Sequence, residues 1–544
     1  MTEQASVHVE GHGGQLALAA LKPFGVTEMF TLSGGHVFPL YDAARSGGVK
    51  IIDVRHEQSA VFAAEAVAKL QRRPGLAVLT AGPGVTNGVS GITSAYFNGS
   101  PVIVLGGRAP LFRWGAGSLQ EIDHVPLVAP VTKHAATVMA TADVAGALRE
   151  AAMTALRPHR GPVFLDFPLD VIYDKAAATV STVSTVESIE PDPGEVAKAA
   201  ALLAAAQRPV IIAGSDVYAG DAIAALREAA EALQIPVFTN GMGRGCLPPG
   251  HPLAFTKARR AALKGADAVA VVGTPLDFRL NFGDFGEATV VHIVDAPSQR
   301  ATHVTPAVSP VGDLRVILSA LADHRGVRAD HKDWIDQLRQ VEDAARAAEV
   351  AELEADTDPI KPSRVYGELR KILDPDAVTI GDGGDFVSYA GRYLEPAQPG
   401  TWLDPGPYGC LGTGMGYAIG ARLTYPDRQI CVLLGDGAAG FSLMDVETLV
   451  RHKLPVVMVV GNNGIWGLEK HPMQALYGYD VAADLQPGLR YDAVVEALGG
   501  AGETVSKPAD LAPALRRAFD ASVPYLVNVL TDPADQYPRS SSLA

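Results

Sequence analysis

The 544-residue sequence contains only three cysteines, Cys246, Cys410 and Cys431. Their spacing matches neither a zinc site nor a CxxC redox pair, so a metal–thiolate centre and a disulfide framework are both excluded. We interpret the three as small core residues rather than reactive thiols. Cysteine use of this kind fits a reducing cytoplasm, where we place the protein.

Positive charge is scarce as well, since 45 Lys and Arg stand against 60 Asp and Glu, a formal net charge of −15. This balance argues against non-specific binding to nucleic acid. The sequence has no run of about 18 apolar residues, so we expect no membrane span. The opening segment, MTEQASVHVEGHGG, has no basic stretch followed by an apolar one. We therefore read no secretory signal in it.

The remaining composition is that of an ordinary globular protein, with 48% hydrophobic residues, 56 Gly and 38 Pro. At roughly 150 residues per domain, the length predicts three or four domains. Short β-branched runs alternate with Ala-rich helical segments such as 60–72 and 196–206, a pattern that predicts parallel α/β sheets. The clearest expected strands are 51–54, 76–79, 102–105, 163–166, 210–213, 268–272, 290–294, 431–434 and 456–460.

Two stretches have the composition of linkers. Residues 176–194 are rich in Ser, Thr, Pro and acidic residues, and residues 351–362 are acidic and end in prolines. They divide the chain into three α/β units, which we place at 1–175, 190–345 and 360–544. Three α/β domains in a row serve many functions, so the fold alone decides nothing about activity.

The segment from Leu433 to Lys470 carries the most chemical information. A strand ends at Leu434 and is followed by the turn GDG and a helix, and the next strand delivers Asn462-Asn463 beyond its tip. Both turns therefore lie at the carboxyl ends of adjacent parallel strands, where α/β sheets bind ligands. A second GDG, at 381–383, also ends a strand but has no Asn pair at the right distance behind it.

Asp436 and Asn463 are expected to be neighbours in space on this interpretation. One carboxylate, one amide oxygen and a nearby carbonyl suit a hard cation such as Mg²⁺. Gly437 lets the backbone approach a phosphate, and the helix that follows points its N-terminus at it. The segment thus predicts a diphosphate held through a metal ion; the alternative is that these residues only shape turns.

GDG followed by NN at this spacing resembles the cofactor signature of thiamine-diphosphate enzymes. The resemblance covers essentially the whole chain and implies a pyrimidine-binding domain, a middle nucleotide- or CoA-binding-like domain and a diphosphate- and Mg²⁺-binding domain, in that order. It also implies a homodimer or homotetramer with active sites at the subunit interface, because Glu57 of one subunit meets Asp436 of the other. The middle domain of relatives holds ADP or FAD, and Asp295 is a candidate for the ribose; which nucleotide applies here stays open.

The family requires a glutamate that hydrogen-bonds the pyrimidine ring and drives its amino group toward the imine that deprotonates the thiazolium. Glu57, just past a strand at the start of an Ala-rich helix, matches this position; alternatively it is a first-turn helix carboxylate. Leu411 matches the residue that wedges the cofactor into its bent form, Gly409 offers a carbonyl to the pyrimidine amino group, and Ile465 offers one to Mg²⁺. The resemblance assigns these residues to the cofactor: Glu57, Pro83, Asn87, Asp385, Phe386, Gly409, Leu411, Gly435, Gly437, Ala438, Ala439, Asn463, Ile465, Trp466, Gly467 and Leu468.

Three further residues match proton-handling positions in relatives. Gln120 lies in a loop shared by acetolactate synthases and the CoA-dependent branch, and His36 lies where benzaldehyde lyase carries an active-site histidine. Glu469 falls where pyruvate decarboxylase carries a catalytic glutamate. The alternatives are an exposed polar loop for Gln120, a structural histidine for His36 and a surface turn for Glu469.

Lys257, Arg259 and Arg260 form a compact basic group in an acidic protein. Their segment resembles that of oxalyl-CoA decarboxylase and 2-hydroxyacyl-CoA lyase, in which Arg259 matches a position that holds a CoA phosphate. The alternative is a solvated helix face. The resemblance therefore favours a carbon–carbon lyase that cleaves a 2-hydroxyacyl-CoA to formyl-CoA and an aldehyde or ketone, reversibly. The other hypothesis is an acetolactate synthase-like condensation of two 2-oxo acids. The C-terminal YPRSSSLA is either a lid or a disordered tail.

Overall fold

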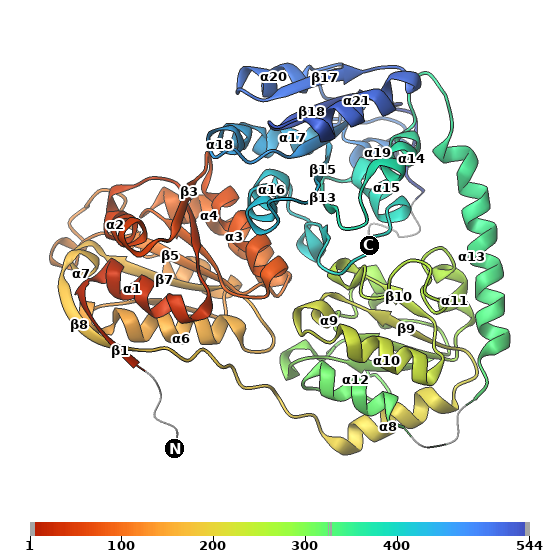
Figure 1. Ribbon diagram of the computed structural model, residues 1–544, viewed down its shortest axis with the longest axis horizontal. Coiled ribbons are helices and arrows are strands. Elements are labelled where there is room, and N and C mark those ends of the chain that lie inside the picture. The colour runs from red at the N-terminus through yellow and green to blue at the C-terminus, as the bar shows by residue number, and fades with distance from the viewer. Residues whose placement is uncertain (1–5, 325, 327–328, 539–544) are drawn as a thin grey trace.

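A computed structural model describes residues 6–324, 326 and 329–538. It shows three α/β domains in chain order, which confirms the predicted fold class (Figure 1). Residues 539–544, most of the predicted lid segment, lie outside the described residues. Within the described part, no helix is both long and apolar enough to cross a bilayer.

The N-terminal domain is built on a six-stranded parallel sheet in the order β3-β2-β4-β5-β7-β6. Its strands are β2 (Glu28–Thr31), β3 (Lys50–Asp53), β4 (Gly75–Leu79), β5 (Val102–Arg108), β6 (His134–Thr137) and β7 (Val163–Pro168). Helices α3 (Glu57–Gln71) and α4 (Pro83–Phe97) cover one face, and α1 (Gly13–Leu21), α2 (Phe38–Gly47) and α6 (Val144–Leu156) cover the other. The apolar runs are continuous because both faces are buried: Ala77 and Leu79 face α3, whereas Leu76 and Val78 face the opposite layer.

The predicted linker at 176–194 begins as a strand. Strand β8 (Lys175–Ser181) pairs antiparallel with β1 (Ser6–His12), in the register Ser6↔Ser181 to His12↔Lys175. The linker is therefore shorter than predicted and consists of the residues between β8 and α8 (Pro193–Ala205). The pairing escaped prediction because the two partners lie at opposite ends of the domain in sequence.

The middle domain has a four-stranded parallel sheet in the order β10-β9-β11-β12. Its strands are β9 (Pro209–Ala213), β10 (Val237–Thr239), β11 (Ala268–Val272) and β12 (Thr289–Ile293). Helices α9 (Ser215–Ala219), α10 (Ile223–Leu233), α11 (Arg259–Gly265) and α12 (Leu314–Ala322) surround it. The long helix α13 (Lys332–Leu353) then runs along the side of the molecule toward the last domain (Figure 1).

The C-terminal domain has a six-stranded parallel sheet in the order β14-β13-β15-β16-β18-β17. Its strands are β13 (Val378–Asp382), β14 (Trp402–Leu403), β15 (Ile430–Gly435), β16 (Val457–Asn462), β17 (Ala501–Val505) and β18 (Tyr525–Leu530). The helices are α14 (Pro362–Ile372), α15 (Asp385–Tyr393), α16 (Thr413–Thr424), α17 (Asp436–Ser442), α18 (Val446–Arg451), α19 (Gly467–Tyr477), α20 (Tyr491–Ala497) and α21 (Pro508–Asp520). The register Gly435↔Gly461 brings the turns after β15 and β16 side by side.

Helices α3 and α16 pack closely and join the N-terminal domain to the C-terminal one (Figure 1). Glycines allow this approach: a Cβ at Gly416 would lie 2.6 Å from the Cβ of Phe62, and one at Gly420 would lie 2.5 Å from the backbone oxygen of Ala63. Buried Asp445 adds polar contacts, since it accepts hydrogen bonds from the backbone N–H of Arg55 (2.7 Å) and the hydroxyl of Ser59 (2.6 Å). The start of α3, where Glu57 lies, is thereby fixed against the last domain.

Candidate active site

Asp436 is the first residue of α17 and is only 4% exposed. Its Oδ1 accepts the N–H of Gly437 at 2.9 Å and its Oδ2 accepts the N–H of Gly464 at 2.6 Å. The carboxylate therefore ties the turn after β15 to the turn after β16. Burial raises the pKa of Asp436 to about 6, while the N–H groups of Gly464 and Gly437 act against that rise.

The two asparagines after β16 have different surroundings. Asn462 is buried, and its Nδ2 donates to the backbone oxygen of Leu489 (2.9 Å) and to Oδ1 of Asn528 (3.1 Å), so it holds the sheet together. Asn463 is partly exposed, and its Oδ1 accepts the N–H of Ile465 at 3.2 Å. Gly464, which lies between Asn463 and the start of α19, has a φ of +71°, a conformation that favours glycine.

The oxygen atoms gathered here suit a magnesium ion and a diphosphate. A carboxylate, an amide oxygen and a backbone carbonyl form the hard donor set that Mg²⁺ prefers. The space beside Gly435 is open, since a Cβ placed there would meet no atom within 4 Å. A Cβ at Gly437 would lie 2.5 Å from the ring of Trp466, so that ring occupies the space a side chain would need. The residues present therefore fit the group that the sequence predicts.

The second GDG motif holds the turn that carries Leu411. Asp382, fully buried at the end of β13, accepts the N–H groups of Gly412 (3.0 Å) and Gly414 (2.8 Å). Burial raises the pKa of Asp382 to about 7, and these donors act against the rise. Gly409 and Gly412 have φ of +69° and +87°, which shape the turn. Sequence reasoning set this motif aside for want of an Asn pair, although its place at a strand end was a usable signal.

The other residues assigned to the cofactor surround these two turns. Ala438 and Ala439 are buried in α17, and Gly467 and Leu468 begin α19. The backbone N–H of Trp466 donates to the oxygen of Ala483 at 2.8 Å. Asp385 starts α15, whereas Phe386 is 5% exposed and packs beneath Gly461, whose added Cβ would lie 2.2 Å from its ring.

Glu57 begins α3 and is 6% exposed. Nδ2 of Asn87, from α4, donates to its Oε2 at 3.0 Å. Asn87 and Pro83 are themselves exposed in the first turns of α4. The helix N-terminus is capped by His56, whose Nδ1 accepts the N–H of Gln58 at 3.2 Å. One oxygen of the Glu57 carboxyl group is thus fixed by a neighbouring amide.

His124, which sequence reasoning missed, holds the Gly-Pro-Gly loop in place. It is fully buried; its Nε2 accepts the N–H of Gly82 at 3.0 Å, and its Nδ1 lies 2.9 Å from Oδ2 of Asp166. This pair of partners requires the imidazole with its proton on Nδ1. The same Asp166 oxygen accepts a 3.0 Å hydrogen bond from Arg108. The only signal in the sequence was the place of His124 four residues beyond Gln120.

His36 and Gln120 lie beside this loop. Gln120 has a left-handed backbone (φ +60°), and a Cβ at Gly82 would lie 2.8 Å from its Cβ. His36 is in the short 3-10 helix η2 (Gly35–Val37), with Nδ1 3.4 Å from Oγ1 of Thr80. Burial lowers the pKa of His36, which favours a neutral ring. The structure therefore brings His36, Gln120 and the loop together at one edge of the sheet.

Glu469 lies in the first turn of α19 with an exposed side chain. Its neighbour Lys470 pairs with Asp480 at 3.1 Å and with Asp484. The carboxyl group of Glu469 is thus at the surface of this chain, next to an ion-paired lysine.

The three basic residues of the middle domain do not form one exposed group. Nζ of Lys257 lies 2.6 Å from Oε2 of Glu349 and donates to the backbone oxygen of Arg392 at 2.5 Å. Nη1 of Arg259 donates to Oδ1 of Asn240 at 2.6 Å. Burial, and then the nearby guanidinium groups of Arg244 and Arg279, lower the pKa of Arg259 to about 10. Only Arg260 of the three is exposed.

Three family models match the chain, and each lies within a different domain. They are the N-terminal TPP binding domain of thiamine pyrophosphate enzymes (residues 11–127), the central domain (196–321) and the C-terminal TPP binding domain (382–529). The acetolactate synthase large subunit of Mycobacterium tuberculosis is 52% identical, over 98% of both chains. The 2-hydroxyacyl-CoA lyase 2 of Caenorhabditis elegans is 35% identical over 96% of this chain and 90% of its own. The human protein of that name is 33% identical over 89% and 83%. The chain therefore belongs to the thiamine pyrophosphate enzymes.

Proposed function

We propose that the protein is a thiamine-diphosphate- and Mg²⁺-dependent carboligase that condenses two 2-oxo acids, as an acetolactate synthase does. The observation that carries this proposal is the 52% identity with an acetolactate synthase large subunit over 98% of both chains, against 33–35% with the 2-hydroxyacyl-CoA lyases. It replaces the hydroxyacyl-CoA cleavage that the sequence motifs favoured.

The surroundings of Lys257 support the change. A residue that binds a CoA phosphate needs a charge that no other group of the chain engages, but the ammonium of Lys257 is engaged by Glu349 and by the backbone of α15. The ring of Tyr393 also lies 5.3 Å from it. Lys257 therefore serves the packing of α13 against α15, and the expected CoA site loses one of its three cations.

The bound cofactor supplies an electron sink for the acyl group, and the chain supplies orientation and proton control. In this proposal Asp436, Asn463 and the carbonyl of Ile465 hold the Mg²⁺ and through it the diphosphate. Glu57 bonds the pyrimidine ring, and Asn87 keeps its carboxyl group in one orientation. His124 fixes the Gly82 loop through a backbone hydrogen bond.

His36 and Gln120 are proposed to orient the carbonyl of a 2-oxo acid. A neutral imidazole offers one donor and one acceptor, and a primary amide offers both as well. Their place beside the Gly82 loop supports this role. The proton-shuttling role for Glu469 stays a prediction of the resemblance.

Cleavage of a 2-hydroxyacyl-CoA remains a second candidate because of Arg259. Its guanidinium is partly buried, has the Asn240 amide as its hydrogen-bond partner and lies near two further guanidinium groups, those of Arg244 and Arg279. Arg279 is itself paired with Asp277 at 2.7 Å, which leaves Arg244 and Arg259 as the guanidinium groups suited to a phosphate. A CoA thioester or a nucleotide would supply one.

Substrate depletion decides between the two reactions. The Mg²⁺–thiamine-diphosphate enzyme is incubated with pyruvate or with a 2-hydroxyacyl-CoA, and acetolactate, formyl-CoA and aldehyde are quantified. Acetolactate from pyruvate supports the proposal, and consumption of the thioester alone refutes it. Glu57→Gln, run in parallel, shows that any turnover belongs to this site.

Two further properties stay predictions. The resemblance implies a homodimer or homotetramer with each site shared between subunits, which sedimentation velocity tests. It also implies ADP or FAD in the middle domain. The cavity at the carboxyl edge of that sheet, beside Ser215, Gly241 and Thr274, measures about 50 Å³, well below the roughly 300 Å³ of ordinary ligand pockets. To identify any bound nucleotide, the purified protein is denatured and the supernatant is analysed by chromatography.

A further inference from the structure

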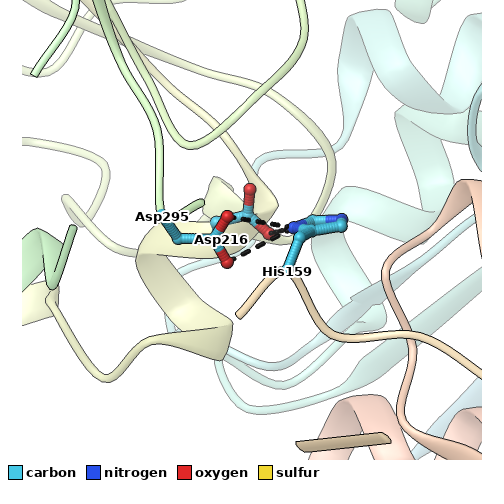
Figure 2. A group of neighbouring side chains, drawn as sticks. All are labelled: His159, Asp216 and Asp295. Atoms are coloured by element: carbon cyan, nitrogen blue, oxygen red, sulfur yellow. Dashed lines mark hydrogen bonds and ion pairs between the residues drawn. The ribbon is translucent and has the colours of Figure 1, made fainter. Parts of the chain in front are cut away.

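Three side chains from two domains converge outside the proposed active site (Figure 2). His159 comes from the loop between α6 and β7 of the N-terminal domain. Asp216 lies in α9, and Asp295 follows β12, so both carboxylates stand at the carboxyl edge of the middle sheet. One ligand atom from each of the three lies within 4.8 Å of the other two.

The two carboxylates have too few hydrogen-bond donors. Nδ1 of His159 is 3.1 and 3.3 Å from the two oxygens of Asp295 and 3.7 Å from Oδ1 of Asp216. Within the described part of the chain, no other group donates a hydrogen bond to either carboxylate. One ring N–H thus serves both carboxylates, and the carboxylate of Asp216, a residue 9% exposed at the edge of a cavity, has no hydrogen bond within the described part of the chain. An arrangement this poor in donors is costly for a charged group.

Neighbouring charges do not remedy the shortage. Nη1 of Arg160 is 3.9 Å from Oδ2 of Asp295, too far for a hydrogen bond. The ammonium of Lys133 acts on Asp295 only through space, and it donates instead to the backbone oxygen of Arg157 at 2.7 Å. Apart from the His159 ring, no cationic side chain of the described residues is within hydrogen-bond distance of the two carboxylates.

The distances from the imidazole nitrogen to the two carboxylates match those between ligands around one metal ion. Nitrogen and oxygen ligands about 2.1 Å from a tetrahedral Zn²⁺ lie roughly 3.4 Å from each other. The observed separations of 3.1 and 3.7 Å from the imidazole nitrogen to the two carboxylates bracket that value. The cavity of about 50 Å³ that His159 and Asp216 help to line leaves room for a few waters to complete the coordination.

We propose that His159, Asp216 and Asp295 bind a divalent first-row transition-metal ion, Zn²⁺ matching the ligand set best, which joins the N-terminal domain to the middle domain. Imidazole with carboxylates is a ligand set for Zn²⁺ and its neighbours rather than for Mg²⁺ alone. The site is separate from Asp436 and does not depend on which substrate the enzyme uses. Its role is structural, because the ligands come from both sides of a domain boundary.

Metal retention tests the proposal on the full-length enzyme with Mg²⁺ and thiamine diphosphate present. The protein is mixed with one equivalent of ZnCl₂, desalted into Mg²⁺ buffer and analysed by mass spectrometry for metal content. We expect one Zn²⁺ per wild-type chain and a Tm that rises with Zn²⁺. Asp216→Asn, Asp295→Asn and His159→Phe should each lose the retained Zn²⁺ and the rise in Tm.

Two controls separate this site from others. Glu231→Gln removes the carboxylate of another His–carboxylate pair in the middle domain, in which Nε2 of His251 is 3.0 Å from Oε1 of Glu231, and it should keep the Zn²⁺. Asp436→Asn removes the proposed Mg²⁺ ligand and should keep it too. Failure of wild type to retain Zn²⁺ overturns the proposal, as does full retention by any folded variant of the three ligands. Because three different ligands are changed, one misfolded variant leaves the test intact.

Discussion

Nδ2 of Asn87 donates a 3.0 Å hydrogen bond to Oε2 of Glu57, across the contact between α4 and α3. The other oxygen of the carboxyl group, Oε1, takes no part in this bond. The residue is only 6% exposed. A carboxyl group held in this way can keep a proton at one defined position, as the role proposed for Glu57 requires. The loop from Gly82 to Asn87 therefore acts on the site through Glu57 as well as through its own backbone.

Glu57→Gln tests this arrangement. The amide has nearly the same shape but cannot exchange a proton with the pyrimidine ring, so turnover should fall by at least about 10²-fold, the usual contribution of a positioned acid or base. Initial rates with pyruvate, together with circular dichroism and the Tm, measure the effect. Glu503→Gln, which changes a carboxylate paired with Arg517 far from α3 in sequence, is the control and should keep full activity. A Glu57→Gln enzyme of near-normal rate would contradict the mechanism.

His124→Phe should impair the reaction even though His124 is not proposed to contact the substrate. The phenyl ring fills the space but leaves the Gly82 N–H without its acceptor and Asp166 with Arg108 alone, a loss of about 1–3 kcal/mol for the buried donor. We expect the KM for thiamine diphosphate to rise and kcat to fall by roughly 10-fold or more, because each 1.4 kcal/mol is tenfold.

His124→Gln provides the matched rescue. Its amide oxygen can accept from Gly82 and its NH₂ can donate to Asp166, so it should recover much of the loss. His134→Phe, at an exposed histidine of edge strand β6, should have little effect. If the Phe and Gln variants at 124 lose stability equally and keep the wild-type KM for the cofactor, His124 is only a core residue.

The sequence predicted what depends on local pattern. Continuous apolar runs such as 431–434 became buried parallel strands, and the turns after β15 and β16 met because neighbouring strands end at the same edge of the sheet. The comparisons confirmed the cofactor family inferred from that spacing. Residues 176–181 (AAATVS) were taken for the start of a linker, because their strand partner β1 lies far away in sequence.

The partners of individual side chains could not be predicted from the sequence, for the same reason. Lys257 looked like a solvent-facing phosphate ligand, yet its partner Glu349 is on a helix that begins much later in the chain. The role of Asp382 depends on Gly412 and Gly414, across a turn that only the folded chain brings back to β13. His159 meets its two carboxylates across a domain boundary. The sequence motifs thus located the turns of the site, whereas the long-range side-chain contacts became known only from the structure.

Lys257→Met and Arg260→Met should differ sharply in stability. The ammonium of Lys257 and the carboxylate of Glu349 are both 7% exposed, so removing one partner of this buried pair should cost about 3 kcal/mol. Arg260 is exposed, and its loss should change the free energy of unfolding by less than about 0.5 kcal/mol. Urea denaturation measures both. If instead Lys257→Met keeps its stability and raises the KM for an acyl-CoA, Lys257 is a substrate ligand.

Asp382 should give the protein a pH-dependent stability between about pH 4 and pH 7. Its pKa is about 7 in the fold and 3.8 in the unfolded chain, so across this window the native state binds more protons than the unfolded state. Stability from this group therefore falls as pH rises through the window and is constant below and above it. Asp382→Asn cannot ionise, and it loses one acceptor for the Gly412 and Gly414 N–H groups at every pH.

The Tm of the Asn variant, measured against that of wild type from pH 4.5 to 7.5, isolates the effect. Wild type should be the more stable at the acid end, and its advantage should shrink steadily as pH approaches 7. Asp374→Asn, at an exposed carboxylate of the same domain, controls for the loss of a charge and should show no such trend. A Tm difference between wild type and Asp382→Asn that stays constant over the range would mean that Asp382 is ionised throughout. The two backbone N–H groups would then hold the Leu411 turn through a carboxylate rather than a carboxylic acid.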